Sequence, residues 1–546
     1  MTIAVVDIET NGLKNEATKI HCIVAKEYTT GKIKTWVQDE CKEFGEWSKL
    51  VDTFIMHNGL SFDAPLLNKF TNSSIQSNQI RDTLLESQLF NPIRDKGHSL
   101  RAWGEKLNFS KGEVESFDDY TPDMLTYCIQ DVELTFKVAK YLEKESKNFS
   151  KQSVILENKI RIILDQQEEN GFTLNLRKAS ELMATLQDEA DTLVEKAQKL
   201  FPDTEVQLKT KVKYIPFNIG SRKQIAERLM ERGWEPKLKT DKGNVIVNEE
   251  VLKTIKLPEA KMFSRYLLLQ KRVAQIKSWI ILCDKDNKVH GKVMTLRTIT
   301  GRMAHNSPNM AQVPAVYSPY GKECRDCWTV SDLTKYSLVG TDASGLELRC
   351  LAHYMNDTKF TNELLTGDIH TANMKMAGLT NRDQAKTFIY AFLYGAGAAK
   401  IGKIVGGGAK KGQQLIDRFL SNMPALNALR TKVQRASQNG IIRGLDGRLL
   451  HIRSTHSALN TLIQGAGAVV CKHWLLEIMS SIKMTRIDAK LVASIHDEYQ
   501  FEVNNKDINT FGQITKEAMK KTQQVLKLNC ELDSEWKMGE TWASTH

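Results

Sequence analysis

The sequence predicts a multidomain α/β protein. Its 546 residues are enough for about three or four hydrophobic cores of ordinary domain size. Apolar residues alternate with a period of two near both ends of the chain, at 2–9 and 491–503, which is the pattern of half-buried β-strands. The stretch from about 153 to 200 is rich in Glu, Lys, Gln and Leu and indicates helix. Hydrophobic residues make up 41% and charged residues 26%, as in a folded globular protein.

Charge and cysteine usage narrow the class of protein. The net charge of +11 favours a polyanionic partner, although many basic proteins bind none. No run of about 18 apolar residues occurs, so no membrane span and no membrane partner are expected. The N-terminus, MTIAVVDIET, lacks the basic region of a signal peptide, and nine scattered cysteines favour a reducing cytosol. Cys324 and Cys327 have the spacing of a zinc half-site, but without a second pair a zinc site is the weaker alternative.

Four carboxylates in the first 150 residues each lie beside an apolar element. Asp7 and Glu9 are two apart on a predicted strand, so both point to one side of the sheet. The segment HNGLSFD ends in Asp63. A helix that starts at TPD, with Thr as cap and Pro in the first turn, carries Tyr127 and Asp131 on one face.

Each of these patterns is ordinary by itself, because acidic pairs on strands usually face solvent. If the four carboxylates converge, they repel one another at neutral pH unless cations neutralise them. Two bridging divalent ions would do so, and two-metal sites hydrolyse phosphodiesters.

The motifs DIET, HNGLSFD and YCIQD resemble, in order and spacing, the three motifs of the DEDD-type 3′–5′ exonucleases in their Tyr-containing version. The resemblance implies an RNase H-like exonuclease domain at 1–150 that acts on single-stranded DNA. It also implies that Asp7, Glu9, Asp63 and Asp131 bind metal and that Tyr127 orients the attacking water.

The interval 151–300 is helical and basic and carries no catalytic motif. Ser221 and Gln224 form a capping box, and Gly233 closes that helix. An exposed basic helix face is often only solvated; the alternative is that these side chains contact the phosphates of a duplex without reading its sequence. The basic residues of this interval are Lys209, Lys211, Lys213, Arg222, Lys223, Arg228, Arg232, Lys237, Lys239 and Lys242.

A second acidic site is predicted in the C-terminal half. An apolar strand at 336–341 ends at Asp342. The hairpin at 491–503 has His496, Asp497 and Glu498 at its tip, where an acidic, solvated turn is the simpler interpretation. Paired with Asp342, however, Asp497 would provide oxygen ligands for a divalent cation.

The helix predicted at 380–395, TNRDQAKTFIYAFLYG, has two distinct faces. Its apolar stripe consists of Ala385, Phe388, Ile389 and Phe392. A different line along the helix consists of Arg382, Lys386, Tyr390 and Tyr394. Two cations followed by two aromatic rings match a triphosphate followed by a base, although a plain amphipathic helix would show the same stripe. Asn460 and Gln464 form another polar pair four residues apart.

The motifs TGR, DASGLELR, RDQAKTFIYAFLYG and HDE resemble the successive motifs of family A DNA polymerases, typified by bacterial DNA polymerase I, and are most similar to those of podovirus-type phage replicases. The resemblance covers nearly the whole chain. It implies a right-hand fold with a helical thumb at 151–300, helical fingers at 366–455, and an antiparallel-sheet palm at 301–365 and 456–546.

The resemblance also implies residue roles. Asp342, the carbonyl of Ala343 and Asp497 would bind two magnesium ions, for which manganese could substitute, and Glu498 would support them. The exonuclease site would likewise take two ions. Glu347 would block a ribose 2′-hydroxyl, and Tyr394 would meet the templating pair. The incoming nucleotide would be held by Arg382, Lys386, Tyr390 and His370, with Lys386 as proton donor to the leaving group. The primer–template would be contacted by Arg302, Gln464, His496, Asn460 and Asn309.

The expected partners are primer–template DNA, single-stranded DNA and deoxynucleotides, with a helicase–primase and a single-strand binding protein as candidate replisome partners. Some phage members of the family carry a loop in the thumb that recruits host thioredoxin. Thioredoxin is not expected as a partner here, because the interval from about 150 to 294 is barely long enough for a thumb without that loop. Since the chain starts at the exonuclease motifs, removal of RNA primers is not expected. A cytoplasmic localisation is expected, which is the cytoplasm of the host cell if the protein is phage-encoded.

Two other functions fit parts of the sequence. An RNA-synthesising or RNA-copying relative is disfavoured by Glu347 and by the complete exonuclease motifs. A catalytically silent nucleic-acid clamp is disfavoured because every expected carboxylate is present.

Overall fold

The structure is a computed structural model that describes residues 2–109, 112–207 and 211–546. The chain divides into two compact units. Unit 1 consists of Met1–Asn170, Lys292–Asn306 and Val339–Lys537, and unit 2 of Gly171–Gly291, Ser307–Leu338 and Met538–His546. Within the described ranges, no helix is both long and apolar enough to cross a lipid bilayer.

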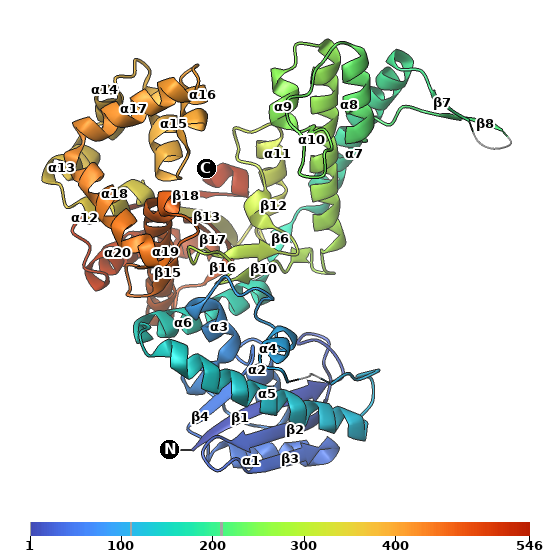
Figure 1. Ribbon diagram of the computed structural model, residues 1–546. Coiled ribbons are helices and arrows are strands. Elements are labelled where there is room, and N and C mark those ends of the chain that lie inside the picture. The colour runs from blue at the N-terminus through green and yellow to red at the C-terminus, as the bar shows by residue number, and fades with distance from the viewer. Residues whose placement is uncertain (1, 110–111, 208–210) are drawn as a thin grey trace. The chain divides into compact units, whose positions relative to one another are not determined.

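A mixed five-stranded sheet forms the N-terminal part of unit 1, in the order β3-β2-β1-β4-β5 (Figure 1). The strand expected at 2–9 is confirmed as β1, which pairs antiparallel with β2 and parallel with β4. The strands are β1 (Ile3–Thr10), β2 (Ile20–Glu27), β3 (Ile33–Val37), β4 (Thr53–Met56) and β5 (Ile80–Asp82). The helices are α1 (Phe44–Ser48), α2 (Asp63–Phe70), α3 (Thr83–Phe90), α4 (Leu100–Lys106) and α5 (Pro122–Ser146).

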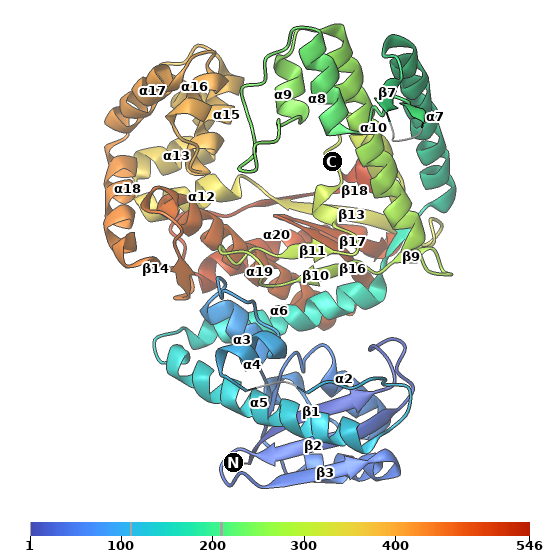
Figure 2. The same ribbon diagram turned by 45° about the vertical axis from the view of Figure 1, so that its right-hand side comes forward.

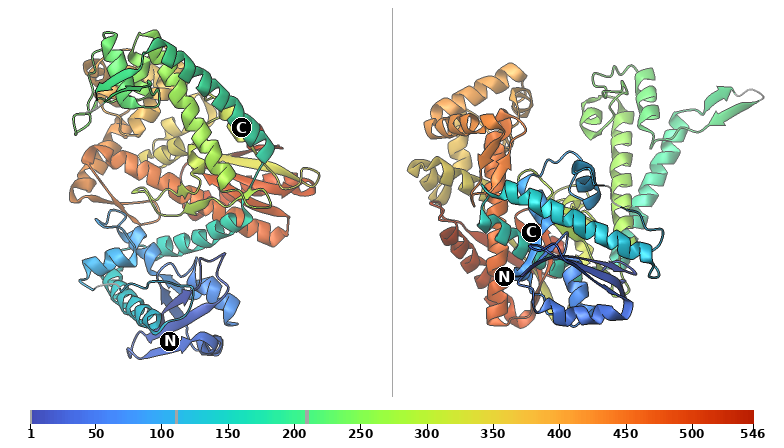
Figure 3. Two further views of the ribbon diagram at one scale, coloured as in Figure 1. Left: turned by 90° about the vertical axis from the view of Figure 1, so that its right-hand side faces the viewer. Right: turned by 60° about the horizontal axis from the view of Figure 1, so that its bottom comes forward.

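Helix α5 begins where the sequence predicts. The Thr121 side chain accepts a hydrogen bond from the Met124 backbone N–H, and Pro122 occupies the first turn. The helix packs on β1 and β2 and crosses the sheet (Figure 3). Cys128 and Asp131 are among its buried residues.

The C-terminal part of unit 1 contains an antiparallel hairpin in a four-stranded sheet of order β16-β17-β13-β18. The strands are β13 (Tyr336–Ala343), β16 (Ala489–Ile495), β17 (Glu498–Asn504) and β18 (Ser534–Gly539). Helices α6 (Lys151–Asn170), α19 (Ala458–Thr485) and α20 (Ile508–Val525) run along this sheet (Figure 2).

The prediction of two half-buried strands in this hairpin is wrong, because β16 and β17 are buried along most of their length. On one face, the Tyr499 hydroxyl donates to the Cys471 carbonyl of α19, and the Phe501 ring packs on Phe511 of α20. On the other face, Gln500 is fully buried and donates to the Glu498 carboxylate at 2.6 Å. Polar side chains in the strand therefore did not mark a solvent-facing side.

The predicted nucleotide helix, α15, belongs to a run of helices that continues along the chain into a hairpin. The helices are α12 (Leu346–Met355), α13 (Thr358–Thr366), α14 (Ile369–Ala377), α15 (Arg382–Leu393), α16 (Ala398–Ile404), α17 (Ala409–Asn422) and α18 (Pro424–Ala436), and the hairpin strands are β14 (Ile441–Arg443) and β15 (Leu449–His451). The predicted apolar stripe of α15 is confirmed: Ala385, Phe388, Ile389 and Phe392 are buried. Phe388 and Phe392 both pack on Phe419 of α17, with ring centroids 5.0 and 5.7 Å apart.

In unit 2, two long helices, α7 (Leu176–Leu200) and α10 (Pro258–Ile281), pack side by side (Figure 3). Shorter α-helices and strands of this unit are β6 (Phe172–Leu174), β7 (Thr204–Gln207), β8 (Val212–Ile215), α8 (Arg222–Glu231), α9 (Glu249–Thr254), β9 (Lys288–Val289), α11 (Gly321–Asp326) and β12 (Trp328–Thr329). Two short strands, β10 (Lys292–Met294) and β11 (Ala304–Asn306), belong to unit 1.

The helix expected from about 153 to 200 is interrupted. Gly171 adopts a φ of +63°, which a residue with a Cβ rarely adopts, and strand β6 follows it. Half of the predicted capping box of α8 is present: the Ser221 side chain accepts from the Gln224 backbone N–H. The Gln224 side chain accepts from the Asn218 backbone N–H at 2.7 Å instead of from that of Ser221, so the reciprocal bond of the box is absent. Cys324 and Cys327 are both buried with free thiols.

The predicted basic residues of unit 2 fall into three groups. Lys209 lies outside the described residues. Arg228 and Arg232 form ion pairs with Glu231 and Glu259. The remaining predicted basic residues are exposed: Lys211, Lys213, Arg222, Lys223, Lys237, Lys239 and Lys242.

The division into units cuts across the domain boundaries expected at 150 and 300. Helix α6 and residues 292–300 lie in unit 1, although the sequence assigned them to a thumb, whereas 307–338 and 538–546 lie in unit 2. Helix α6 packs in unit 1 through a buried apolar face, formed by Leu156, Ile160, Ile163 and Leu164, and through a buried ionic cluster. Glu157 of α6 pairs with Lys472 of α19 at 2.7 Å and with Arg448 at 2.9 Å, and each of these side chains is at most 2% exposed.

Removing the charge of Glu157 should strongly destabilise unit 1. Glu157→Gln leaves Lys472 and Arg448 without their shared carboxylate in a dry interior, which costs about 3–5 kcal/mol of unfolding free energy. Urea unfolding followed by circular dichroism measures the loss. The control is Glu169→Gln on the same helix, whose partly exposed pair with Lys14 is worth at most about 1 kcal/mol. Equal losses in the two variants would contradict the structural role of the cluster.

Candidate functional site

The structure brings together the two carboxylates that the sequence predicts for the second site. Asp342 lies near the end of β13, and Asp497 lies in the turn between β16 and β17. The Ala343 backbone N–H donates to the Asp497 carbonyl at 3.1 Å, which holds the turn against the end of β13. His496 has a φ of +58°, the left-handed conformation that a two-residue hairpin turn requires.

Negative charge is concentrated at this point. Burial and then the charges of Asp497, Glu498 and Glu535 raise the pKa of Asp342 to about 8. Burial and then Glu347 raise the pKa of Asp497 to about 6. Clustered oxygen donors whose ionised forms destabilise one another are the donor set that suits magnesium.

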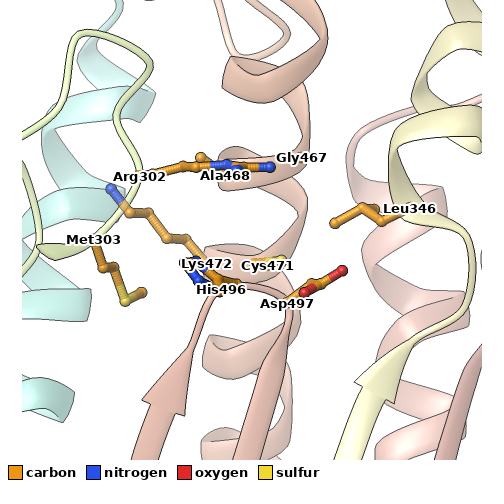
Figure 4. A pocket seen from close by; sticks show the side chains of 9 residues that line it. All are labelled: Arg302, Met303, Leu346, Gly467, Ala468, Cys471, Lys472, His496 and Asp497. Carbon is orange, nitrogen blue, oxygen red and sulfur yellow. The ribbon is translucent and has the colours of Figure 1, made fainter. Parts of the chain in front are cut away.

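Glu347, at the first turn of α12, links three elements. Its carboxylate accepts from Arg302 Nη2 at 2.8 Å and from the Tyr394 hydroxyl at 3.1 Å. Arg302, His496 and Asp497 line one pocket, and Lys472 extends from α19 toward the loop that carries Arg302 (Figure 4). Lys472 donates to the Gly301 carbonyl at 2.9 Å, so this loop is fixed from the interior.

Three residues of the predicted line, Arg382, Lys386 and Tyr390, lie on α15, and Tyr394 is the C-cap residue of this helix. Arg382 is exposed and donates two hydrogen bonds to Asp368, at 2.7 and 3.1 Å. Lys386 is exposed one turn later. The Tyr390 ring lies 6.2 Å from the His370 ring, and burial and then the charges of Arg382 and Lys386 lower the pKa of His370.

The predicted primer–template residues are only partly brought together. Asn460 on α19 donates to the Tyr394 carbonyl at 3.3 Å, and Gln464 is half-buried one turn later. Burial and then Arg302 lower the pKa of His496. Asn309 belongs to unit 2 and is therefore not placed against the other four.

Part of the predicted acidic site in the N-terminal sheet converges. One ligand atom each from Asp7, Glu9 and Cys128 lies within 4.8 Å of the other two. Asp63, at the start of α2, is buried, accepts a hydrogen bond from the Ile8 backbone, and has its pKa raised to about 7 by burial and then by Asp82.

The other two predicted residues of this site lie on α5. Asp131 is buried on that helix, and Tyr127 is half-buried one residue before Cys128. The Tyr127 ring packs edge-on against Phe117, with ring centroids 6.1 Å apart.

Two residues near these sites were missed by the sequence analysis. Asp82 is buried, caps α3, and accepts from the backbone N–H groups of Asn58 and Leu60, which fixes the loop before Asp63. The sequence DTLLE, an acidic cap before a helix, was a signal for it. Cys128 had no such signal, because its neighbours on β1 and β2 are distant in sequence.

Comparison with known proteins decides the family. A family model described as DNA polymerase family A matches residues 177–544. The chain belongs to DNA polymerase family A. The DNA-directed DNA polymerases of Escherichia phage T7 and Enterobacteria phage T3 are each 31% identical to it over 703 aligned positions, covering 99% of this chain and 99% of the relative. DNA polymerase I of Bacillus subtilis is 26% identical, covering 71% of this chain and 45% of the relative.

A solved structure shares the fold of this family A polymerase. The POL domain of Pol1 from M. smegmatis, in complex with DNA primer-template and dNTP, has a TM-score of 0.83 with 18% identity, and the match covers 99% of this chain and 96% of that one. The multidomain α/β fold class expected from the sequence, with a right-hand polymerase architecture, is therefore confirmed.

Proposed function

We propose that this DNA-directed DNA polymerase of family A copies a template by two-metal-ion phosphoryl transfer and proofreads through an integral 3′–5′ exonuclease, in phage DNA replication. The observation that carries the proposal is the juxtaposition of Asp342 and Asp497 in a cluster that raises the pKa of both. The phage relatives align over 99% of the chain, which supports the same organisation for residues 1–150.

The oxygen donors of the polymerase site fit magnesium, with manganese as a substitute. Asp342, the Ala343 carbonyl and Asp497 would hold two ions, with Glu498 in support. Such ions lower the pKa of a primer 3′-hydroxyl and neutralise a leaving pyrophosphate.

The remaining roles belong to side chains around this cluster. Arg382 and Lys386 bind the triphosphate oxygens, and Lys386 donates a proton to the leaving group. Glu347 excludes a 2′-hydroxyl, Tyr394 contacts the templating pair, and His370 and Tyr390 complete the nucleotide pocket. The primer terminus is oriented by Arg302, Gln464 and His496, with Asn460 and Asn309 as further contacts.

At the exonuclease site, Asp7, Glu9, Asp63 and Asp131 would hold two further magnesium ions, and Tyr127 orients the water. The close approach of Asp7 and Glu9 supports this assignment. Primer–template DNA and deoxynucleotides are the proposed partners, because the M. smegmatis polymerase domain that shares the fold is in complex with DNA primer-template and dNTP. A helicase–primase and a single-strand binding protein are further candidates.

The two activities should be separable. Asp7→Ala combined with Glu9→Ala removes metal ligands from the exonuclease site only, so degradation of single-stranded DNA should fall by orders of magnitude while primer extension with magnesium persists. Asp342→Ala is the reciprocal control and should abolish extension while excision persists. Loss of both activities in either variant would refute the assignment of two independent sites.

Binding to primer–template should depend strongly on salt and little on sequence, because the exposed basic residues of unit 2 would contact phosphates. Affinity should drop at least about tenfold between roughly 50 and 200 mM salt. Replacing Lys237, Lys239 and Lys242 with Ala should flatten the salt dependence by up to about one unit of log–log slope for each lysine that neutralises a phosphate. Lys42→Ala with Lys49→Ala, in the N-terminal part of unit 1, is the control, and an equal effect there would argue against a DNA-binding role for unit 2.

The hydroxyl of Tyr390 should govern the use of dideoxynucleotides. The 3′-hydroxyl of a deoxynucleotide can donate a hydrogen bond to a phosphate oxygen of the same nucleotide, and a dideoxynucleotide lacks this donor. The hydroxyl of Tyr390, one helical turn from Lys386, can supply the missing donor. A hydrogen bond to a charged group contributes roughly 1.5–3 kcal/mol, so Tyr390→Phe should reduce dideoxynucleotide incorporation at least about tenfold. Deoxynucleotide incorporation should barely change.

Single-turnover incorporation of both nucleotide types measures this ratio. Tyr317→Phe, at an exposed tyrosine of unit 2, is the matched control. An unaltered ratio in Tyr390→Phe would show that Tyr390 does not face the nucleotide sugar.

A further inference from the structure

A buried ammonium group holds both ends of the loop that carries Arg302. This loop joins β10 to β11. Lys472 of α19, only 1% exposed, donates to the carbonyl of Thr295 at 3.0 Å and to that of Gly301 at 2.9 Å. Its remaining donor goes to Glu157, whose two carboxylate oxygens lie 2.7 and 2.8 Å away. The three N–H donors of the ammonium thus meet three acceptor groups, and two of these belong to the loop.

A second cation approaches the same loop at Gly301. This glycine has a φ of +74°, and a Cβ atom built on it would lie 2.9 Å from Nη1 of Arg448. Arg448 is itself held by Glu157, with which it pairs at 2.9 Å. Two buried cations that share one carboxylate therefore fix the backbone immediately before Arg302.

The fixed backbone determines where the Arg302 side chain lies. This side chain crosses α19 and lines one pocket together with Asp497 (Figure 4). Its Nη2 atom donates to Glu347 at 2.8 Å. Since Gly301 precedes Arg302 directly, a shift of the Gly301 carbonyl would carry the guanidinium with it.

We propose that Lys472 is a positioning residue for nucleotide incorporation, which it supports by holding Arg302 in place through the loop. The proposal rests on the proposed role of Arg302 at the primer terminus. All three donors of Lys472 are used in the interior, so it acts on the reaction only through this loop. Positioning of this kind matters because a misplacement of about 1 Å can cost about 100-fold in rate.

Lys472→Met tests the proposal, because it keeps a long side chain without N–H donors, while Glu157 retains its pair with Arg448. In single-turnover incorporation of a deoxynucleotide with magnesium, the maximum rate should fall at least about tenfold. The apparent dissociation constant of the deoxynucleotide should barely change, because the cationic side chains of α15 are untouched. Lys521→Met is the matched control: it breaks a half-exposed ion pair between α20 and α19 and should keep the wild-type rate.

A double-mutant cycle separates positioning from a general loss of stability. If Lys472 acts through Arg302, Lys472→Met should slow the Arg302→Ala protein little further, whereas independent effects would multiply. Equal fold reductions in the two backgrounds, or a wild-type rate in Lys472→Met alone, would overturn the proposal. A wild-type rate in Arg302→Ala alone would instead refute the proposed role of Arg302 at the primer terminus, and the positioning role with it.

Gly301→Ala is the second variant if Lys472→Met does not fold. The new Cβ would meet the Arg448 guanidinium and displace the same loop without removing a buried charge. The maximum rate should again fall at least about tenfold, and the effect should again be largely lost in the Arg302→Ala background. Gly97→Ala is its control, since Gly97 also has a positive φ but no atom within 4 Å of an added Cβ. A wild-type rate in folded Gly301→Ala would overturn the proposal.

Discussion

The buried carboxylate of Glu157 is the constraint on which the polymerase site depends. It neutralises Lys472 and Arg448, and Lys472 in turn donates to the carbonyls of Thr295 and Gly301 at 3.0 and 2.9 Å. Burial lowers the pKa of Lys472 to about 8, and the carboxylate of Glu157 opposes this effect. Ionic contacts of this kind cost desolvation, and their value lies in fixing geometry.

A short series of hydrogen bonds connects this ionic cluster to the predicted nucleotide helix. The loop fixed at Gly301 presents Arg302, which binds Glu347, and Glu347 accepts from Tyr394 at the end of α15. The position of α15 at its C-terminal end is therefore linked to the interior of unit 1 by hydrogen bonds to charged groups, which are stronger than those between neutral groups.

Local patterns predicted much of the fold. The apolar stripe of α15, the Thr121 cap of α5 and strand β1 follow from periodicity and capping, which are properties of neighbouring residues. The burial of β16 and β17 did not follow, because the packing of α6, α19 and α20 is not encoded in the strands. The break at Gly171 was missed because the flanking segments are both helical and polar.

The residues of the candidate sites were likewise predicted where a local motif marks them and missed where only distant contacts do. Asp342 and Asp497 were found because each lies in a recognisable motif, and the structure places them together. Glu157 and Lys472 were missed, since a buried ion pair between distant helices leaves no local pattern. Cys128 was missed for a further reason: cysteine is a common core residue, and only the approach of Asp7 distinguishes this one.

The division into two units has a consequence for how the protein can come apart. The chain passes from one unit to the other at 170–171, 291–292, 306–307, 338–339 and 537–538. A protease that cuts one of these crossings leaves the others intact, so a single nick releases neither unit. A fragment that begins or ends at one of them also lacks segments that its own unit needs. The two units are thus compact in space but are not modules in the genetic sense, since no contiguous stretch of the gene encodes either of them.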